Sequence, residues 1–251
     1  MKSLLKHPLR VTARLLWFGT VIVLGCFRYL FTCAFRPAHT NVRALWLQHT
    51  CRRTLRVLGI ELDVAGAIPQ RGLLVCNHLS YVDILALSAC APVVFVAKSE
   101  VRHWPVFGWL ARLAGTVFVD RENRVRVGKT TQEIETALEH GALVVLFPEG
   151  TSSDGKTVLP FKSSLLEPAT HLAHPLTTAL IQYELPDGDV GEEVCYWKDM
   201  TLVPHLLNLM SKRGLRASLR FTQTRAGSSD RKEIARQLHS EILQMKAALA
   251  A

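Results

Sequence analysis

From Gly59 onward, short apolar runs alternate with longer segments of helical periodicity, and this alternation constrains the fold more than any other feature. Apolar runs of about four to eight residues between turn residues are typical of buried strands, whereas apolar positions three and four apart indicate helices. The expected strands span residues 60–64, 73–76, 93–97, 116–119, 143–147, 178–183 and 217–222. The expected helices span residues 81–90, 106–113, 125–140, 161–171, 202–212 and 230–250. This order predicts an α/β fold with a mixed central sheet flanked by helices.

The distribution of charge divides the chain near residue 60. Residues 1–60 carry ten Lys or Arg and neither Asp nor Glu, whereas the other 191 residues carry 20 basic and 21 acidic side chains. We therefore expect a basic, membrane-associating helical segment at 1–60 and one further domain at 61–251. Because this second part is close to neutral, the sequence argues against nucleic acid as a partner despite a formal net charge of +9.

Residues 15–35 form an aromatic and aliphatic stretch that is long enough to cross a bilayer. Arg28 interrupts this stretch, and a central arginine is costly in hydrocarbon, so an interfacial or half-inserted helix is favoured over a spanning one. Residues 42–57 mix apolar and basic positions, which predicts an amphipathic helix on an anionic membrane surface. A core helix with a solvated charged face is the open alternative, and for the N-terminus so is a signal or transit peptide. The expected location is the cytoplasmic face of a membrane.

The six cysteines form no Cys-x-x-Cys pair and have no ligand-like spacing to histidine. They are typical of small buried residues in a reducing compartment, so we expect neither disulfides nor a metal site.

The segment at 77–83 carries the strongest sign of chemistry, and it reads NHLSYVD. It follows an apolar run and precedes another, which puts His78 and Asp83 where a strand ends and a helix begins. An imidazole oriented by a carboxylate can take a proton from a hydroxyl, and no Ser or Cys nucleophile is needed if that hydroxyl itself attacks an acyl group. A capping box, with Ser80 at the N-cap and Asp83 at N3, is a structural interpretation compatible with this one.

Two further segments decide between these interpretations: GTVFVDR at 115–121 and FPEGT at 147–151. Together with NHLSYVD, in this order, they resemble the glycerolipid acyltransferases typified by bacterial 1-acylglycerol-3-phosphate acyltransferase, whose patterns are NHxSxxD, GxxFxxR and FPEGT. The resemblance covers about residues 65–185, the motif core. Residues 197–210 look like the tail of a lysophospholipid or lyso-ornithine lipid subgroup.

The resemblance implies that His78 is the general base and Asp83 its orienting partner. Arg121 would hold the acceptor's head group through its guanidinium, although a surface ion pair is the structural alternative. The turn at 149–151 would place the acceptor near His78, whereas its plain alternative is the turn that ends a strand. The substrate-binding residues implied in this way are Asn77, Ser80, Arg121, Glu149, Gly150 and Thr151.

The expected reaction moves a fatty acyl group from acyl-CoA or acyl carrier protein to the free hydroxyl of a lysolipid, without a metal or prosthetic group. The first candidate acceptor is 1-acylglycerol-3-phosphate, which would give phosphatidate. Ser152 stands where phosphatidate-forming relatives often have an arginine, so lyso-ornithine lipid or another lysophospholipid is the alternative acceptor. Hydrolysis of the acyl donor and a noncatalytic membrane lipid-binding protein are alternatives of other classes. The intact pair of His78 and Asp83 argues against a noncatalytic protein.

Overall fold

The computed structural model describes residues 7–35, 39–120, 124–170, 174–225 and 227–250. In this part of the chain a seven-stranded sheet has the order β1-β7-β6-β2-β5-β3-β4. The strands are β1 (Ile60–Ala65), β2 (Gly72–Cys76), β3 (Val93–Lys98), β4 (Val117–Val119), β5 (Leu143–Leu146), β6 (Leu176–Glu184) and β7 (Leu215–Thr224). Strands β6 and β7 pair antiparallel, whereas the other neighbouring pairs are parallel. The sheet is therefore mixed.

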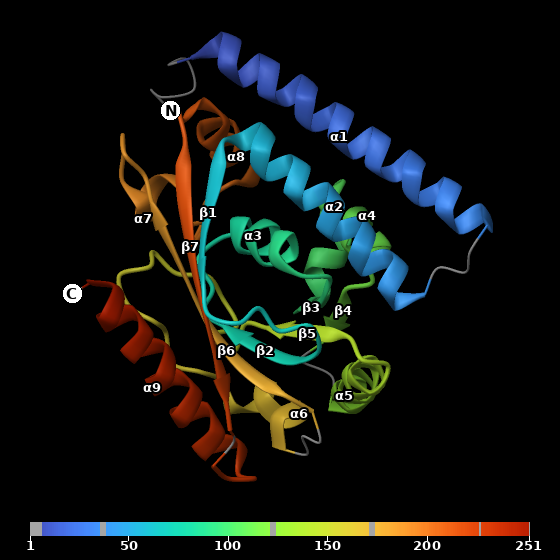
Figure 1. The fold of residues 1–251 in the computed structure, drawn as a ribbon, viewed down its shortest axis with the longest axis vertical. Helices are drawn as coiled ribbons and strands as arrows, with labels where there is room; N and C mark the ends of the chain where they lie inside the picture. The colour runs from blue at the N-terminus through green and yellow to red at the C-terminus, as the bar shows by residue number, and fades with distance from the viewer. Residues whose placement is uncertain (1–6, 36–38, 121–123, 171–173, 226, 251) are drawn as a thin grey trace.

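Helices cover both faces of this sheet (Figure 1). They are α1 (Pro8–Phe35), α2 (Thr40–Leu58), α3 (Val82–Cys90), α4 (Phe107–Leu113), α5 (Arg124–Glu139), α6 (Glu167–Thr170), α7 (Val190–Glu193), α8 (Leu202–Ser211) and α9 (Arg231–Ala250), with short 3-10 helices η1 (Ser99–His103) and η2 (Ser163–Leu166). One apolar core joins the sheet to α2, α3 and α8, and a second joins it to α5, α6 and α9. The predicted fold class is confirmed.

Most expected elements after residue 59 agree with the observed bounds within two residues. The helix expected at 161–171 is wrong, because the chain forms η2 and then the four-residue α6, while residues 171–173 lie outside the described part. Pro168 explains the break. Proline lacks an N–H, and its ring clashes with the carbonyl four residues earlier, so a regular α-helix cannot run back through Ser164.

Helices α1 and α2 pack side by side, with α1 outermost in the molecule (Figure 1). Trp46 Nε1 donates a hydrogen bond to the Gly25 carbonyl at 2.7 Å, and the Tyr29 and Trp46 rings lie 5.4 Å apart. A Cβ at Gly25 would lie 3.0 Å from Thr50 Oγ1, so glycine permits the close approach. Among the described residues, α1 is also the one helix whose length and composition would suffice to cross a membrane.

Two arginines tie α1 to the C-terminus of α8. Arg10 Nη1 donates to Ser211 O at 2.8 Å, and Arg14 Nη1 donates to Met210 O at 3.0 Å and Lys212 O at 2.6 Å. The last carbonyls of a helix have no partner inside it and carry partial negative charge, which favours cations. Arg10 and Arg14 therefore attach α1 to the end of α8.

The inner side of α2 packs on α3 and contributes Leu55 and Leu58 to the core beside the sheet. Arg52 Nε on the same helix donates to Ala89 O at 2.7 Å. On its inner side, this segment is thus a core helix, as in the alternative left open by its sequence. Contact of its charged outer side with an anionic membrane stays a prediction. The division of the chain at residue 60 stays a prediction.

Candidate active site

His78 lies in the loop between β2 and α3, at the carboxyl end of a buried parallel strand. Ligands bind at such strand ends in open α/β sheets. Asn77 fixes the start of the loop, because its Nδ2 donates to Ile181 O at 3.0 Å and its Oδ1 accepts from Ile181 N at 2.8 Å. These bonds extend the β2–β6 ladder by one residue beyond Cys76. The Asn77 amide is therefore occupied by backbone and positions the next residue.

Asp83 lies in the first turn of α3 and is completely buried. Its Oδ2 accepts hydrogen bonds from His78 Nδ1 at 2.7 Å, Leu79 N at 2.7 Å and Ser80 N at 3.0 Å. Its Oδ1 accepts from the hydroxyl of Tyr183 at 2.5 Å. Charge-assisted bonds of this length are about twice as strong as neutral ones, so the loop folds around the carboxylate.

The His78 ring is held on one edge and on one face. A carboxylate can only accept a hydrogen bond, so Nδ1 of His78 must donate to Asp83. In the neutral ring the proton is therefore on Nδ1, and Nε2 carries the lone pair. The ring stacks on Phe147, with centroids 4.2 Å apart and an interplanar angle of 19°. Its side chain is 23% exposed, and no described residue makes a hydrogen bond to Nε2. A partly exposed imidazole whose Nε2 has no hydrogen-bond partner in the described part of the protein is the form that a general base requires.

Glu149 links the FPEGT turn to residues 77–81, the histidine loop. Its Oε1 accepts from His78 N at 2.7 Å and its Oε2 from Leu159 N at 3.0 Å. The side chain is buried, and burial raises the pKa of the Glu149 carboxyl to about 7, partly offset by these two N–H donors. Both oxygens are occupied by backbone, so the carboxylate fixes two loops against each other.

The rest of the FPEGT turn is also bound to neighbouring loops. Gly150 has a φ of 72°, a conformation that favours glycine, and its N–H donates to Phe147 O at 3.1 Å. The Ser152 hydroxyl donates to Tyr196 O, while Tyr196 N donates to Leu79 O at 2.8 Å. Tyr196 thus bridges the FPEGT turn and the histidine loop. Thr151, between Gly150 and Ser152, is exposed.

The predicted capping box forms only in part. Asp83 reaches back to the N–H of Ser80, as the N3 residue of a capping box does. The Ser80 hydroxyl is buried and makes no hydrogen bond to the described residues, and the residue at the N-cap position is Tyr81. The physical reason is that the N–H of Asp83, which the serine hydroxyl of a capping box would bind, donates to the Ser80 carbonyl instead, at 3.1 Å.

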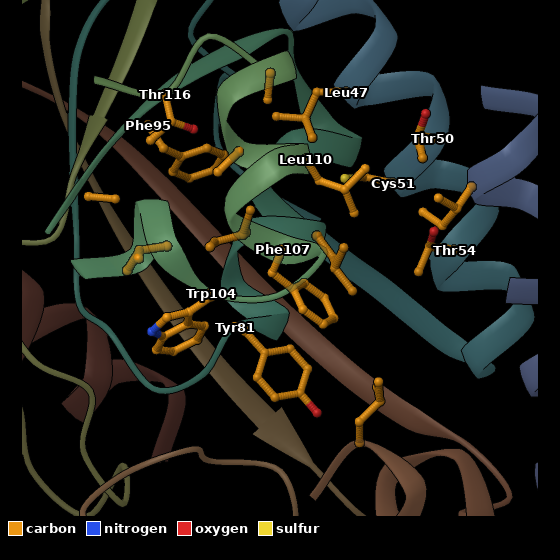
Figure 2. A pocket seen from close by; sticks show the side chains of 18 of the residues that line it. Leu47, Thr50, Cys51, Thr54, Tyr81, Phe95, Trp104, Phe107, Leu110 and Thr116 are labelled. Carbon is orange, nitrogen blue, oxygen red and sulfur yellow. The ribbon is translucent and has the colours of Figure 1, made fainter. Parts of the chain in front are cut away.

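An apolar cavity of about 180 Å³ lies between α2, α3, α4 and β3. Figure 2 shows side chains of these elements facing a common space, among them Cys51, Phe95, Phe107 and Leu110. Phe95 connects the cavity to the histidine, because its ring stacks on Phe147 at 6.0 Å between centroids. The cavity therefore begins two stacked rings away from His78.

Two of the polar side chains in the cavity wall are paired with protein atoms. Thr50 Oγ1 donates to Trp46 O at 2.9 Å. The Tyr81 hydroxyl lies 2.9 Å from His205 Nδ1, and His205 Nε2 lies 3.0 Å from Cys195 O. Because a carbonyl only accepts, the His205 proton is on Nε2, and Tyr81 donates to Nδ1. Burial lowers the pKa of His205, in keeping with a neutral ring. The wall is left mainly with apolar surface.

Known proteins identify this combination of fold and loops. The family model described as Acyltransferase matches residues 60–182. The chain is 37% identical over 217 residues to the lyso-ornithine lipid O-acyltransferase of Rhizobium meliloti, which covers 80% of this chain and 74% of the relative. The chain belongs to the glycerolipid acyltransferase family. It is also 34% identical over 163 residues to the 1-acyl-sn-glycerol-3-phosphate acyltransferase of Neisseria meningitidis, covering 60% of this chain and 64% of the relative.

A solved structure supports the fold of this acyltransferase. The crystal structure of the 1-acyl-sn-glycerophosphate acyltransferase PlsC from Thermotoga maritima superposes with a TM-score of 0.66 and covers 96% of this chain and 98% of the other. The two sequences are 20% identical, so the likeness concerns the fold alone. The predictions of the family and of an acyltransferase activity are thus confirmed.

The structure brings seven of the eight predicted site residues together, while Arg121 lies outside the described residues. Within that group, Asn77 and Glu149 are bonded to backbone rather than directed outward. Their assignment to substrate binding stays a prediction, as do the catalytic roles of His78 and Asp83. In the described part of the acyltransferase no three His, Cys, Asp or Glu residues are grouped as metal ligands would be, and the six cysteines are free.

Sequence reasoning missed Tyr183, Phe147 as the surface beneath His78, and the bridge at Tyr196. Tyr183 had a usable signal: it follows Ala179 and Ile181 in the two-residue period of β6, and all three belong to the core beside α3. No local pattern announces the Tyr196 bridge, because its partners lie more than a hundred residues away at Leu79 and 44 residues away at Ser152.

Proposed function

We propose that this acyltransferase moves a fatty acyl group from a thioester donor to the free hydroxyl of lyso-ornithine lipid, with His78 as general base. The observation that carries the proposal is the partly exposed His78 ring, which Asp83 holds at 2.7 Å and Phe147 supports by stacking, and whose Nε2 has no partner among the described residues. A hydroxyl that lies against Nε2 would lose its proton as it attacks.

The chemistry needs only these groups. The acceptor oxygen attacks the thioester carbonyl carbon while Nε2 takes the hydroxyl proton, which gives a tetrahedral oxyanion and an imidazolium stabilised by Asp83. When the oxyanion collapses, the C–S bond breaks, the ester remains, and the imidazolium returns its proton to the leaving thiolate. Acyl-CoA and acyl carrier protein both supply such a thioester, and we propose either as donor.

The apolar cavity supports the acyl part of the proposal. Its wall combines aliphatic and aromatic side chains of α2, α3 and α4, and the hydroxyls of Thr50 and Tyr81 have partners in the protein. Each buried methylene contributes about 0.8 kcal/mol, so a fatty chain would gain from leaving water here. The link from Phe95 through Phe147 to His78 would bring the carbonyl end of such a chain to the base.

The choice of acceptor rests on two observations. The relatives named lyso-ornithine lipid O-acyltransferase, from Rhizobium meliloti and from Brucella abortus, align with 80% and 76% of this chain. In addition, the position that would hold an arginine for a phosphate monoester is Ser152, whose hydroxyl is bonded to Tyr196 O. We keep 1-acylglycerol-3-phosphate as the second acceptor, because a relative so named is 34% identical over 163 residues.

We further propose that α1 lies in the interfacial plane of a membrane, on its cytoplasmic face. Trp17, Leu24, Phe27 and Phe31 are each at least 60% exposed and recur on one side of the helix. A spanning α1 would carry the charged outer side of the attached α2 into hydrocarbon, which is costly. Arg53 and Arg56 of α2 line an open groove beside Trp17, where they would meet the anionic lipids of a cytoplasmic leaflet.

Product analysis tests the function. The purified full chain is incubated in vesicles with labelled acyl-CoA or acyl carrier protein thioester and with lyso-ornithine lipid, 1-acylglycerol-3-phosphate or a zwitterionic lysophospholipid. The expected product is diacylated ornithine lipid, formed with the highest kcat/KM of the three acceptors. Preference for 1-acylglycerol-3-phosphate would select the second acceptor, and release of free fatty acid without transfer would identify a hydrolase.

A further inference from the structure

Tyr183 approaches the carboxylate of Asp83 from the sheet, on the side opposite to His78. It lies near the end of β6, the strand that Asn77 joins to β2. Its hydroxyl is 2.5 Å from Asp83 Oδ1, a contact that spans 100 residues of sequence. No other side chain of the sheet makes a described hydrogen bond to this carboxylate.

The four donors around Asp83 are divided unequally between its two oxygens. His78, Leu79 and Ser80 all donate to Oδ2. Oδ1 accepts from Tyr183 alone among the described residues. Rotation about the Cβ–Cγ bond would exchange the two oxygens, and the bond to Tyr183 opposes that rotation.

Solvent cannot replace the tyrosine, because Asp83 is completely buried and Tyr183 is nearly so. Burial, with the neighbouring Asp83 carboxylate, raises the pKa of Tyr183 well above its ordinary value. The hydroxyl therefore stays protonated and acts as a donor over the working pH range. A buried carboxylate oxygen without a donor would be strongly destabilised.

We propose that Tyr183 is a positioning residue of the acyl-transfer reaction, which fixes the orientation of the Asp83 carboxylate and so the tautomer and direction of the His78 ring. The inference rests on the proposed general-base role of His78. Tyr183 itself touches neither substrate nor the reacting atoms. Its effect is transmitted through Asp83 Oδ1, and it concerns the rate of the chemical step rather than the binding of lipid.

The hydroxyl also shares the negative charge of the carboxylate. Without it, that charge acts undiminished on the His78 ring, which then binds a proton more tightly, and the acid limb of the rate profile moves to higher pH. Other titratable groups face the same carboxylate: the thiols of Cys76 and Cys195, whose pKa burial raises, and the Glu149 carboxyl, whose pKa lies at about 7. All three groups are present in both the wild type and a variant in which only Tyr183 is replaced.

The test is Tyr183→Phe in the full chain, compared with Thr178→Val. Thr178 lies on the same strand in the other core layer, is completely buried, and its hydroxyl donates to the Glu241 carboxylate at 3.1 Å. Both changes thus remove a buried hydroxyl from a carboxylate. Tyr183→Phe is expected to lower kcat about tenfold or more, as loss of a bond to a charged group does, with KM for the lysolipid unchanged and the acid limb at higher pH. Thr178→Val is expected to leave kcat and the acid limb at their wild-type values.

A second replacement keeps the inference falsifiable if Tyr183→Phe does not fold. A ring-fluorinated tyrosine at position 183 keeps the shape and the hydroxyl but makes it a stronger donor, so the acid limb is expected to move to lower pH. Wild-type kcat and an unmoved acid limb in either folded variant would overturn the role of Tyr183. His78→Ala separates the two proposals, because an active His78→Ala enzyme defeats the general-base function itself, whereas an inactive one leaves that function standing when Tyr183 fails.

Discussion

The histidine loop and helix α1 are held to the protein by opposite means. The loop is held by the side chains of Asn77, Asp83 and Glu149, which bind backbone groups on several segments, and each of the three is buried. Along α1, by contrast, Phe27 and Phe31 are 69% and 60% exposed. The loop is therefore complete without a ligand, whereas α1 presents an apolar surface that water does not favour. The geometry around His78 is thus fixed by the protein itself, whereas the outer surface of α1 would gain from an apolar environment such as the proposed membrane.

The largest effect expected on this comparison comes from His78→Ala. It removes the group with the free Nε2 and leaves the surface of α1 unchanged, so acyl transfer should fall about 10²- to 10⁴-fold while vesicle binding stays the same. Transfer rates and flotation with anionic vesicles measure the two properties. His140→Ala is the control, since His140 is exposed on the other side of the sheet. A folded His78→Ala enzyme with more than a tenth of the wild-type rate would rule out the general base.

The reverse separation is expected from Phe27→Glu combined with Phe31→Glu. Each phenylalanine would contribute roughly 1.5 to 3 kcal/mol on leaving water, so vesicle binding should weaken about a hundredfold or more. Activity on lysolipid dispersed in detergent should stay near the wild-type value. The matched control is Leu243→Glu with Leu249→Glu, two exposed leucines on α9 across the sheet from α1. If the control weakens flotation as much as the α1 variant does, α1 is not the membrane-binding surface.

These α1 variants replace a deletion of residues 1–60, which the charge distribution suggests as the simplest test. The deletion would remove Leu55 and Leu58 of α2 from the core beside α3. Charge counts cannot distinguish a helix that rests on a membrane from one that rests on the protein. The distinction depends on what faces the helix, which here is α3, far along the chain from α2.

The alternation of strands and helices predicted the layers of the fold, because buried parallel strands are apolar throughout. The motifs NHLSYVD and FPEGT similarly predicted two loops that meet at the strand ends, whereas Arg121 of the third motif lies outside the described residues. The sequence did not predict which group each polar side chain binds. Glu149 and Asn77 belong to the motifs, yet their side chains bind backbone, and Tyr183 lies in no motif and binds Asp83. Such roles arise from strand pairing and from contacts across loops, which local patterns do not specify.

A moderate effect is expected from Glu149→Gln, through the links between the FPEGT turn and the histidine loop. The amide nitrogen of glutamine cannot accept, so either His78 N or Leu159 N loses its partner, at a cost of about 1 to 3 kcal/mol. Because the folded-state pKa of Glu149 is raised to about 7, the wild type binds a proton more tightly when folded, and its stability falls as pH rises from about 4.5 to about 7.

The stability gap between wild type and Glu149→Gln should therefore narrow by on the order of 2 to 3 kcal/mol between pH 5 and pH 8, since each unit of pKa shift is worth about 1.4 kcal/mol. Unfolding free energies in detergent at the two pH values measure the gap. Glu139→Gln, a change on the far side of the sheet, controls for the general effect of losing a carboxylate. A gap that is independent of pH would show that Glu149 is ionised at both pH values.

The smallest effect is expected at Ser152, where the head-group side of the site meets the Tyr196 bridge. Ser152→Arg adds a cation next to the turn that the acceptor is proposed to reach, and should raise the ratio of kcat/KM for 1-acylglycerol-3-phosphate over lyso-ornithine lipid about tenfold, the lower end of what a charge-assisted bond provides. The change also removes the hydrogen bond from the serine hydroxyl to Tyr196 O. Ser152→Ala removes that bond without adding charge, so it should lower kcat/KM for both acceptors alike and leave the ratio unaltered. If the ratio of the two kcat/KM values is the same in Ser152→Arg and Ser152→Ala, position 152 does not select the acceptor. The decrease of kcat/KM in both variants then measures only the loss of the Tyr196 bridge, which joins this turn to the histidine loop.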